Sequence, residues 1–406
     1  MKKSLLAAGL MLTAVPAFAA EPDGLVLPKG FHAKVVAEGL GSIRHMAVRG
    51  NDIYVSTTRT GTAPSMGVIA LRLMPDHTIL QNTHFGSVDG GTGIRIHNGA
   101  LYVASGSAIY RFALDDALAP KAAPETIVDG LPGGSHPIAF DGKGSMFVLM
   151  GGGGNICTDP KAPKVGLKPC PALETKAGIW RFDDNKVGQH FADGEHFATG
   201  IRNSSSLDWR DGDALYGVMH GRDGTAKGWP EFLTDADDDA IADEMHRVVK
   251  DTDFGWPYSY YDGKRKLRLV SPEYGGNGKT TVKGDVPVAA FQPMRPAPDD
   301  LQFYSGTAFP AHYRGGAFIA MHGGADAGRA GGNNGYDVVF VPFKAAHAGK
   351  PEEFAGGFAG PDPASRNAKA AAYRPVGVAV APDGALYVAD SNKGRIWRIS
   401  YGETGN

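Results

Sequence analysis

Three short polar segments combine arginine, asparagine, histidine and acidic residues, the types that bind anionic ligands and metal ions. They are residues 200–203 (Gly-Ile-Arg-Asn), residues 220–223 (His-Gly-Arg-Asp) and residues 373–377 (Tyr-Arg-Pro-Val-Gly). Guanidinium groups pair with carboxylates bidentately and stack on planar rings, so converging arginines suit an anionic planar ligand. Ion pairs between neighbouring structural elements are the other explanation, and both remain open at this point. The same class of position includes Asp243, Glu244, His136, His322 and Arg329.

A recurring phrase indicates the elements that must position these residues. An apolar, β-branched stretch leads to a Gly/Asp/Asn turn, then to a short strand of the type Leu-Tyr-Val-Ala, and often to a strand ending in aromatic-Arg. Six copies begin near His45, Gly93, Pro137, Ser206, Leu301 and Val376. A strand–turn–strand unit repeated every 40 to 50 residues is typical of propeller blades. The sequence therefore predicts an all-β, six-bladed β-propeller; an irregular β-sandwich is the alternative.

Long insertions between the copies predict where the site lies. They fall at residues 151–177, 221–285 and 323–335, and we expect them to cap one face of the propeller above its axis. Helical patterns are nearly absent, and residues 238–250 alone look weakly helical. The site is therefore expected beneath these loops, at the ends of the innermost strands.

The first residues resemble a secretory signal. Lys2 and Lys3 form a positive start, residues 5–15 are apolar but too short to span a bilayer, and Ala17-Phe18-Ala19 supplies small residues for cleavage. We expect a signal peptide over residues 1–20, a single propeller domain over residues 21–406, and a periplasmic location.

The net charge of the chain argues against two classes of binding partner. The formal net charge is −2, and removal of Lys2 and Lys3 makes it −4, which argues against nucleic acid or an anionic membrane surface. The two cysteines, Cys157 and Cys170, can pair in an oxidising compartment and would close a 14-residue loop worth roughly 3 kcal/mol. Two unpaired thiols are the alternative.

Two segments resemble known ligand-binding loops but lack residues that those loops require. The segment GGNGKT at residues 275–280 has Glu273 where the first glycine of a phosphate loop belongs. The acidic run from Asp235 lacks the glycine and the final acid of an EF-hand, having Ala240 and His246 there. That acidic run is therefore either a solvated loop or a non-standard calcium site.

Several segments, in order along nearly the whole chain, resemble the soluble quinoprotein glucose/sorbosone dehydrogenase family, nearest its sorbosone dehydrogenase branch. They are PCPALETKAGIWRFD (169–183), ATGIRN (198–203), HGRD (220–223), DFGWPYSYYDG (253–263), PEYGGNG (272–278), FYSGTAFPAHYRGGAFIAMHGG (303–324), GYDVVFVPF (335–343) and RPVGVAVAPDGALYVADSNKGRIWRI (374–399). The resemblance implies a six-bladed propeller with pyrroloquinoline quinone (PQQ) on its axis and a calcium ion. It implies oxidation of a sugar or a sugar-derived aldehyde by hydride transfer to the quinone.

The resemblance also implies roles for individual residues. Arg202 and Asn203 match the pair beside the reactive quinone carbonyl, and Arg374 matches an arginine that pairs with the cofactor's carboxylates. His322 and Arg329 are placed with the cofactor-binding residues. The turn at Gly221 and Arg222 matches the backbone carbonyls that bind calcium, and Glu244 matches an acid of the same loop system. His136 is the predicted general base, and Arg202 the predicted stabiliser of the reduced quinone.

Two segments depart from the family pattern. The run GGGGN after His136 lacks an aspartate that glucose-oxidising relatives carry, and HGGADAGR (322–329) replaces the usual HGSWNR. Two other functions therefore stay open: a propeller that binds a carbohydrate or a protein without redox turnover, and a calcium-dependent lactonase-type hydrolase. A dehydrogenase would need an electron acceptor, for which a periplasmic c-type cytochrome or a diffusible quinone is expected.

Overall fold

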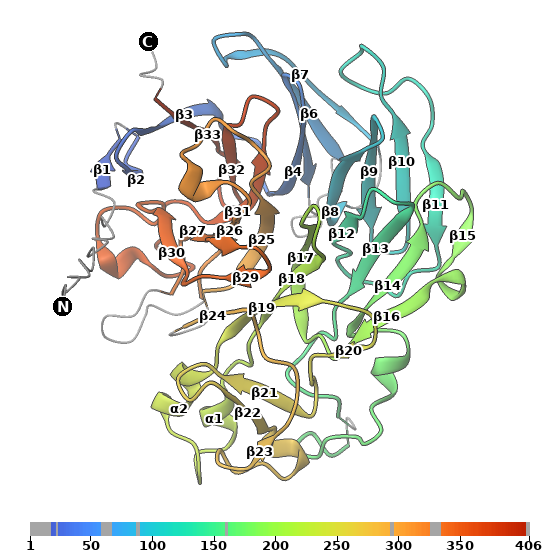
Figure 1. Ribbon diagram of the computed structural model, residues 1–406, viewed down its shortest axis with the longest axis vertical. Coiled ribbons are helices and arrows are strands. Elements are labelled where there is room, and N and C mark those ends of the chain that lie inside the picture. The colour runs from blue at the N-terminus through green and yellow to red at the C-terminus, as the bar shows by residue number, and fades with distance from the viewer. Residues whose placement is uncertain are drawn as a thin grey trace, which may run out of the picture.

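The computed structural model describes residues 18–21, 23–57, 67–86, 90–158, 161–292, 296–324 and 334–402. In this part of the chain, six largely antiparallel sheets of four or five strands make up most of the molecule. Figure 1 shows the sheets arranged around a common centre, with β21–β23, α1 and α2 forming an extension at the bottom of the view. The fold is all-β and consistent with a β-propeller, as the sequence predicts.

Each of the six repeated phrases forms the first strands of one sheet. Within each sheet the strands follow in hydrogen-bonding order from the innermost strand outward. The first three sheets are β4 (Ile43–Arg49), β5 (Asp52–Thr57), β6 (Val68–Leu73) and β7 (Ile79–Phe85); β8 (Gly90–His97), β9 (Ala100–Ser105), β10 (Ile109–Ala113), β11 (Glu125–Asp129) and β15 (Gln189–His190); and β12 (Ile138–Phe140), β13 (Ser145–Met150), β14 (Gly178–Asp183), β16 (Glu195–Thr199) and β20 (Thr252–Asp253). The other three are β17 (Asn203–Trp209), β18 (Leu215–His220), β19 (Asp243–Val248) and β24 (Ala289–Phe291); β25 (Pro298–Phe303), β26 (Ala317–Met321), β27 (Asp337–Val341) and β30 (Glu352–Ala355); and β31 (Pro375–Val380), β32 (Leu386–Asp390), β33 (Ile396–Tyr401) and β3 (Phe31–Ala37).

The remaining elements are short. The small sheets contain β1 (Phe18–Ala20) with β2 (Val26–Pro28), β28 (Phe343–Lys344) with β29 (His347–Ala348), and β21 (Ser259–Asp262) with β22 (Leu267–Val270) and β23 (Thr281–Val282). The α-helices are α1 (Thr225–Gly228) and α2 (Asp235–Ala240), and the 3-10 turns are Pro171–Glu174, Phe191–Asp193, Pro272–Tyr274, Ala311–Tyr313 and Pro363–Ser365. No helix in the described ranges is both long and apolar enough to cross a membrane.

Tight turns explain why the repeated phrase folds as a hairpin. Between β31 and β32 the Asp383 carboxylate accepts a hydrogen bond from the Ala385 backbone, and Gly384 has a φ of +85°. A side chain rarely adopts that left-handed conformation, so the glycine is required there. Between β12 and β13 the Asp141 carboxylate accepts bonds from Lys143 and Ser145 in the same manner. These Asp-Gly turns thus fix where β12 and β31 reverse.

The two ends of the chain share one sheet. The early strand β3 pairs antiparallel with the final strand β33, with Phe31 opposite Tyr401 and Lys34 opposite Arg398. This pairing joins segments more than 350 residues apart, so the last sheet is completed by the beginning of the chain. The repeat alone does not predict this closure, because β3 lies before the first copy of the phrase.

The core consists of apolar layers between neighbouring sheets. One layer packs Val376 and Tyr387 of the last sheet on Ile53 and Ile69 of the first. Another packs Phe147 of the third sheet on residues of the fourth, including Leu215. The strands are therefore apolar on both faces, as expected where sheets stack face to face. The innermost strands β4, β8, β12, β17, β25 and β31 contact one another in a ring.

Bulges re-aim side chains at the starts of the innermost strands. The pairing register shifts between Ile43 and Met46 in β4, between Asn203 and Ser206 in β17, between Pro298 and Asp300 in β25, and between Pro375 and Gly377 in β31. A bulge breaks the strict alternation of a strand, so consecutive residues can face the same side. The consecutive pairs Arg44-His45 and Asp299-Asp300 both reach the centre in this way.

One detail differs from the sequence prediction. The predicted helix over residues 238–250 is wrong beyond Ala240, because residues 243–248 form strand β19, which is hydrogen-bonded to β18 and β24. Tertiary pairing overrides the weak helical pattern. The predicted cleavage site at Ala19 or Ala20 lies in β1, whose residues are exposed. Cleavage there remains a prediction.

Replacing Asp300 with alanine tests the polar contacts that join the innermost strands. The carboxylate is fully buried; it accepts hydrogen bonds from Ser206 Oγ (2.8 Å) and the Val378 backbone (2.9 Å), and it lies 3.7 Å from Arg95 Nη2. Removal leaves the buried guanidinium without this partner, so we expect the free energy of unfolding to fall by about 3–5 kcal/mol.

Urea unfolding followed by fluorescence measures this loss. The control is Asp211→Ala at an exposed turn, which should change the free energy by less than about 0.5 kcal/mol. Equal stability of the Asp300 and Asp211 variants would contradict the proposed role of Asp300.

Candidate active site

The carboxylate of Asp299 lies at the centre of the candidate site. Its Oδ1 atom accepts a hydrogen bond from Ser205 Oγ (3.3 Å) and lies 3.3 Å from His220 Nε2. Its Oδ2 atom lies 3.6 Å from Arg44 Nη1 and 3.6 Å from His322 Nδ1. The carboxylate is 8% exposed, so these groups, which come from three different sheets and the loops beside them, compensate a buried negative charge.

The surrounding groups set the charge state of the cluster. Burial opposes ionisation of Asp299, but His322, His220 and Arg44 outweigh burial and hold its pKa well below the usual range. Burial lowers the pKa of His322 to about 4, with Arg374 and His220 acting in the same direction. Burial would also lower the pKa of His220, but the hydrogen bond and charge of Asp299 raise it overall. One carboxylate thus favours one imidazolium, and the second imidazole stays neutral.

Arg374 lies on the His322 side of the cluster. Its Nε and Nη2 atoms donate to the carbonyl oxygens of His322 (3.1 Å) and Gly323 (2.8 Å), and its guanidinium lies 5.6 Å from the centre of the Tyr336 ring. Burial lowers the pKa of Arg374. Within the described residues it has no carboxylate within 4 Å, and its guanidinium donates to carbonyl oxygens, so the cation suits an anionic ligand.

Arg202 lies on the opposite side, just before β17, and is held on two edges. Its Nε donates to Asn155 Oδ1 (3.1 Å) and its Nη2 donates to Asp223 Oδ2 (2.5 Å). The side chain is 10% exposed. The third nitrogen, Nη1, makes no hydrogen bond to any residue of the described ranges. A guanidinium fixed in this way is pre-organised to donate from its remaining edge.

A cavity of about 170 Å³ lies between the second, third and fourth sheets. Its lining includes His136, Lys176, Asn203, Ser204 and the glycine run 151–153. The Ser204 hydroxyl is buried and has no hydrogen-bond partner among the residues that the structure describes, so a polar ligand could supply one. Asn203 Nδ2 lies 3.1 Å from His220 Nδ1, so this cavity is linked to the Asp299 cluster through His220.

His136 is almost completely buried in the wall of this cavity. Its Nδ1 atom lies 3.2 Å from the Leu149 carbonyl oxygen and its Nε2 atom 3.3 Å from the Gly106 carbonyl oxygen. Burial lowers the pKa of His136 although these carbonyls oppose the shift, so the neutral ring is favoured. A neutral imidazole has one N–H group, so one of its two nitrogens faces a carbonyl without a hydrogen bond.

The turn at residues 220–223 presents two backbone carbonyl groups as potential metal ligands. The Gly221 amide donates to Asp243 Oδ1 (2.7 Å), and the Arg222 side chain forms an ion pair with Glu273 (2.8 Å). In the described part of the chain, the carbonyl oxygens of Gly221 and Arg222 accept no hydrogen bond. Carbonyl oxygens are suitable calcium ligands, so the turn fits the metal predicted from the sequence.

Glu244 fits that metal less well. Its Oε2 atom lies 2.5 Å from Arg268 Nη2 and 3.1 Å from His246 Nε2, and all three side chains are buried. His246 Nδ1 in turn lies 2.7 Å from Asp285 Oδ2. This network attaches β22 of the extension to β19. The described residues contain no cluster of three or more His, Cys, Asp or Glu that could bind a metal ion.

The structure brings most of the predicted site residues together. His136 and Asn203 line one cavity beside Arg202, whereas His322 and Arg374 bond to each other, and His220 with Asp299 connects the two groups. The turn at Gly221 and Arg222 follows His220 directly. Glu244 lies in a separate ion-pair network, and Arg329 lies outside the described residues.

The sequence analysis missed five residues of the site. Asp299 is the most important, and its signal was a pair of acids, Asp299-Asp300, at the start of an apolar strand. Arg44 and His45 show a similar signal, because they interrupt the apolar strand β4. Asn155 and Lys176 lie in an insertion, where the sequence offers no periodic pattern.

Two family models match the chain. One, described as glucose/sorbosone dehydrogenase, matches residues 96–326, and the other, described as TrAA12-like, matches residues 279–402. No protein with a curated description matches the sequence significantly.

Three solved structures illustrate the structural likeness. The calcium structure of the Carbohydrate-Active Enzymes Family AA12 protein from Trichoderma reesei has a TM-score of 0.71 at 16% identity and covers 96% of this chain and 99% of that one. The holo PQQ domain of pyranose dehydrogenase from Coprinopsis cinerea has a TM-score of 0.70 at 16% identity, with 94% and 98% covered. The PQQ-bound aldose sugar dehydrogenase from Streptomyces coelicolor has a TM-score of 0.56 at 19% identity, with 92% and 99% covered. At these identities the likeness shows the fold.

The pKa of His322 gives a test of the cluster. With a folded pKa of about 4, below the ordinary 6.5, the ring stays neutral from pH 8 down to about pH 5. As pH falls below about 6.5, the ring is protonated in the unfolded chain before it is protonated in the folded one. The free energy of unfolding therefore falls between about pH 6.5 and pH 4, by on the order of 3 kcal/mol. NMR titration of the imidazole signals, with His322→Gln used to assign the ring, measures the pKa. Titration of His322 above pH 6 would contradict the charge assignment.

Proposed function

Because the chain belongs to the glucose/sorbosone dehydrogenase family, we propose that it oxidises a sugar or sugar-derived aldehyde with pyrroloquinoline quinone as cofactor. The family makes it an oxidoreductase of the sugar dehydrogenase type. The observation that carries the cofactor is the pair of arginines, Arg202 and Arg374, on opposite sides of the Asp299 cluster. Hydrogen bonds to the protein hold at least one edge of each guanidinium group. Among the described residues, neither guanidinium pairs with a fully buried carboxylate.

The proposal includes a six-bladed propeller. The six four- or five-stranded sheets are taken as its blades, with the last completed by β3, and the innermost strands contact one another in a ring. The starts of these strands, where the bulges lie, form the face that carries the site.

The cofactor is a planar tricarboxylate, and the charges of the site fit it. Arg374 and His322 would hold its carboxylates on one side, and Arg202 with Asn203 would lie beside its carbonyl groups on the other. Arg44, which is 35% exposed beside Asp299, adds a third guanidinium. Arg329 stays a predicted member of this set. The carbonyl oxygens of Gly221 and Arg222 would bind calcium, whereas Glu244 would need to leave its ion pair with Arg268 to do so. When bound, the quinone accepts the hydride from the substrate carbon.

His136 is the proposed general base. Its lowered pKa keeps it neutral at pH 7, and the nitrogen that faces a carbonyl oxygen without a hydrogen bond has a free lone pair. A small rotation toward the cavity would let this nitrogen accept the proton of a substrate hydroxyl group. Arg202 would stabilise negative charge that develops on the acceptor oxygen, because its guanidinium is already oriented and 10% exposed.

A binding protein without turnover is the second candidate. The observation that favours it is the position of His136, whose two nitrogens both face backbone carbonyls rather than the cavity.

For the dehydrogenase, the proposal also includes export to the periplasm and electron transfer to a c-type cytochrome or a diffusible quinone. The substrate within the sugar class, and the sorbosone branch, stay predictions.

Cofactor binding tests the site directly. Apo-protein titrated with PQQ and calcium, followed by cofactor absorbance, should show saturable binding. Arg374→Ala should weaken binding at least tenfold, because a buried cation that faces the ligand is lost. The control Arg247→Ala removes a guanidinium that is paired with Asp213 on an outer strand and 38% exposed, and should bind normally. No binding by the wild-type protein, even with calcium, would leave the binding propeller as the better account.

Turnover tests the base. Dye reduction with a panel of aldoses and sorbosone should be sugar-dependent, and His136→Ala should lower kcat by about 10²- to 10⁴-fold while it leaves PQQ binding within a few-fold of wild type. A variant that retains wild-type kcat would assign the base to another group. Cofactor binding without turnover on any sugar would favour the second candidate.

A further inference from the structure

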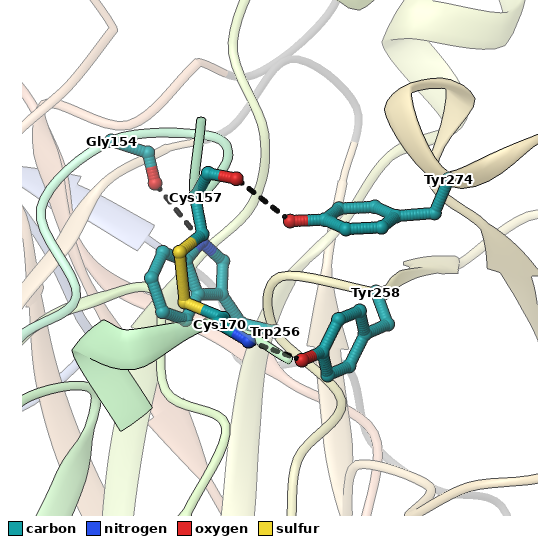
Figure 2. Close-up of a disulfide and its surroundings, with 6 residues drawn as sticks. All are labelled: Gly154, Cys157, Cys170, Trp256, Tyr258 and Tyr274. Atoms are coloured by element: carbon teal, nitrogen blue, oxygen red, sulfur yellow. Dashed lines mark hydrogen bonds between the residues drawn. A yellow bond between two sulfur atoms is a disulfide. The ribbon is translucent and has the colours of Figure 1, made fainter. Parts of the chain in front are cut away.

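The loop between β13 and β14 carries a disulfide next to the candidate site. Cys157 and Cys170 are bonded, with their Cα atoms 5.9 Å apart, which confirms the expected pairing. Both are buried and pack with Ala177 and Trp256 in a small apolar cluster. Figure 2 shows this disulfide surrounded by three aromatic residues.

Hydrogen bonds attach the disulfide loop to the extension. Trp256 Nε1 donates to the Gly154 carbonyl (3.0 Å), Tyr274 Oη donates to the Cys157 carbonyl (3.1 Å), and the Cys170 amide donates to Tyr258 Oη (2.9 Å) (Figure 2). All three aromatic residues belong to residues 221–285. The two predicted insertions therefore hold one another, and the chain segment from Gly154 to Cys157 is fixed at both ends.

Asn155 lies in this fixed segment and uses its side chain to connect two parts of the site. Its Oδ1 atom accepts hydrogen bonds from Arg202 Nε (3.1 Å) and from the Asp223 amide (3.0 Å), and its Nδ2 atom donates to the Asp223 carbonyl (2.7 Å). Arg202 Nη2 donates to Asp223 Oδ2 (2.5 Å), which closes a triangle of hydrogen bonds among the three residues. Asn155 thus holds the guanidinium of Arg202 and the turn that contains Gly221 and Arg222.

The backbone beside Asn155 lies equally close to Arg202. The amides of Gly152 and Gly153 donate to the Arg202 carbonyl at 2.5 and 3.1 Å. A Cβ atom at Gly152 would lie 3.0 Å from the carbonyl oxygens of Ile201 and Arg202, so a side chain there would crowd this approach. The loop therefore fixes both the backbone and the side chain of Arg202.

Asp223 cannot fix Arg202 alone. Its side chain is 67% exposed, so its ion pair with Arg202 is open to water and weak. The bond from Nε to Asn155 sets the plane of the guanidinium, and Nη1 then remains as the edge without a protein partner in the described residues. Loss of this bond would leave the guanidinium free to rotate about its pair with Asp223.

We propose that Asn155 is the positioning residue for Arg202, and that the Cys157–Cys170 disulfide acts on the site by holding Asn155 in place. The part of this inference that concerns the cofactor rests on the proposed function, because it takes Arg202 as a cofactor contact. The part that concerns the position of Arg202 does not.

The first test measures how firmly the Arg202 guanidinium is held in the absence of cofactor. In apo-protein with labelled arginine, the Nε–H signal of Arg202, assigned with Arg202→Lys, should exchange slowly with solvent. Asn155→Ala should speed this exchange at least tenfold, and Asn155→Asp, which keeps the acceptor oxygen, should restore most of the protection. Equal exchange in the wild-type protein and Asn155→Ala would overturn the proposal, whether or not the protein binds PQQ.

The second test reads the consequence for the cofactor. Asn155→Ala should raise the dissociation constant of PQQ by about tenfold and lower kcat by about 10- to 100-fold, with the KM for sugar changed less than about threefold. The same substitution in an Arg202→Ala background should have no further effect, since Asn155 acts through Arg202. An undiminished effect in that background would contradict the positioning role.

The matched control is Asn277→Ala. Asn277 lies on the surface of the extension, where its Oδ1 atom accepts three hydrogen bonds from Lys279 and Thr280, away from the site. It should leave PQQ affinity and kcat unchanged. A loss equal to that of Asn155→Ala would assign both effects to general loosening of the fold.

The third test concerns the disulfide. Cys157→Ser combined with Cys170→Ser should speed exchange of the Arg202 Nε–H and weaken PQQ binding in the same direction as Asn155→Ala. Adding Asn155→Ala to the cysteine variant should give less than the sum of the two effects. Full additivity, or an Arg202 signal unchanged by loss of the disulfide, would contradict the disulfide's part in the proposal.

Discussion

The carboxylate of Asp299 is the interaction on which the candidate site depends. It lies near the centre of the six sheets, and three of them contribute to its surroundings: β25 carries it, His322 follows β26 of the same sheet, and Arg44 and His220 belong to two other sheets. A buried negative charge requires compensation, which the Arg44 guanidinium and the His220 ring with its raised pKa provide. The same carboxylate raises the pKa of His220, whereas burial lowers the pKa of His322 although Asp299 opposes that shift.

Bulges in the innermost strands make this arrangement possible. A regular strand would send Asp299 and Asp300 to opposite faces, whereas the register shift between Pro298 and Asp300 brings both toward the centre. Asp299 then faces the site, and Asp300 connects the strands below it through Ser206 and Val378. One pair of acids therefore serves the site and the interior of the fold together.

The insertions give the site its second support. The disulfide loop and the extension are bonded to each other through Trp256, Tyr258 and Tyr274, and Asn155 transmits that support to Arg202. The Glu244–Arg268–His246 network fixes the extension to β19 from the other side. Arg202 is thus held by elements outside the strand it precedes, which explains how a residue at a loop can have a defined orientation.

The sequence by itself determined the features that depend on neighbouring residues. The Asp-Gly turn and the apolar strand that follows it are local, so the six repeats, the all-β class and the positions of the arginines before β17 and β31 were all predictable. The pairing of Cys157 with Cys170 was predictable because the chain has two cysteines close together. The match of residues 96–326 to the glucose/sorbosone dehydrogenase family agrees with the resemblance drawn from these segments.

Only the tertiary structure decided which polar groups meet. His45 and Asp299 are 254 residues apart, and β3 pairs with β33 across almost the whole chain, so no local pattern could announce either contact. Glu244 and His136 illustrate the same point, because burial next to Arg268 and between two backbone carbonyls changes what each side chain can do. Residue type fixes the chemistry a side chain can perform, whereas long-range pairing fixes its partners and its charge, and those are properties of the folded chain.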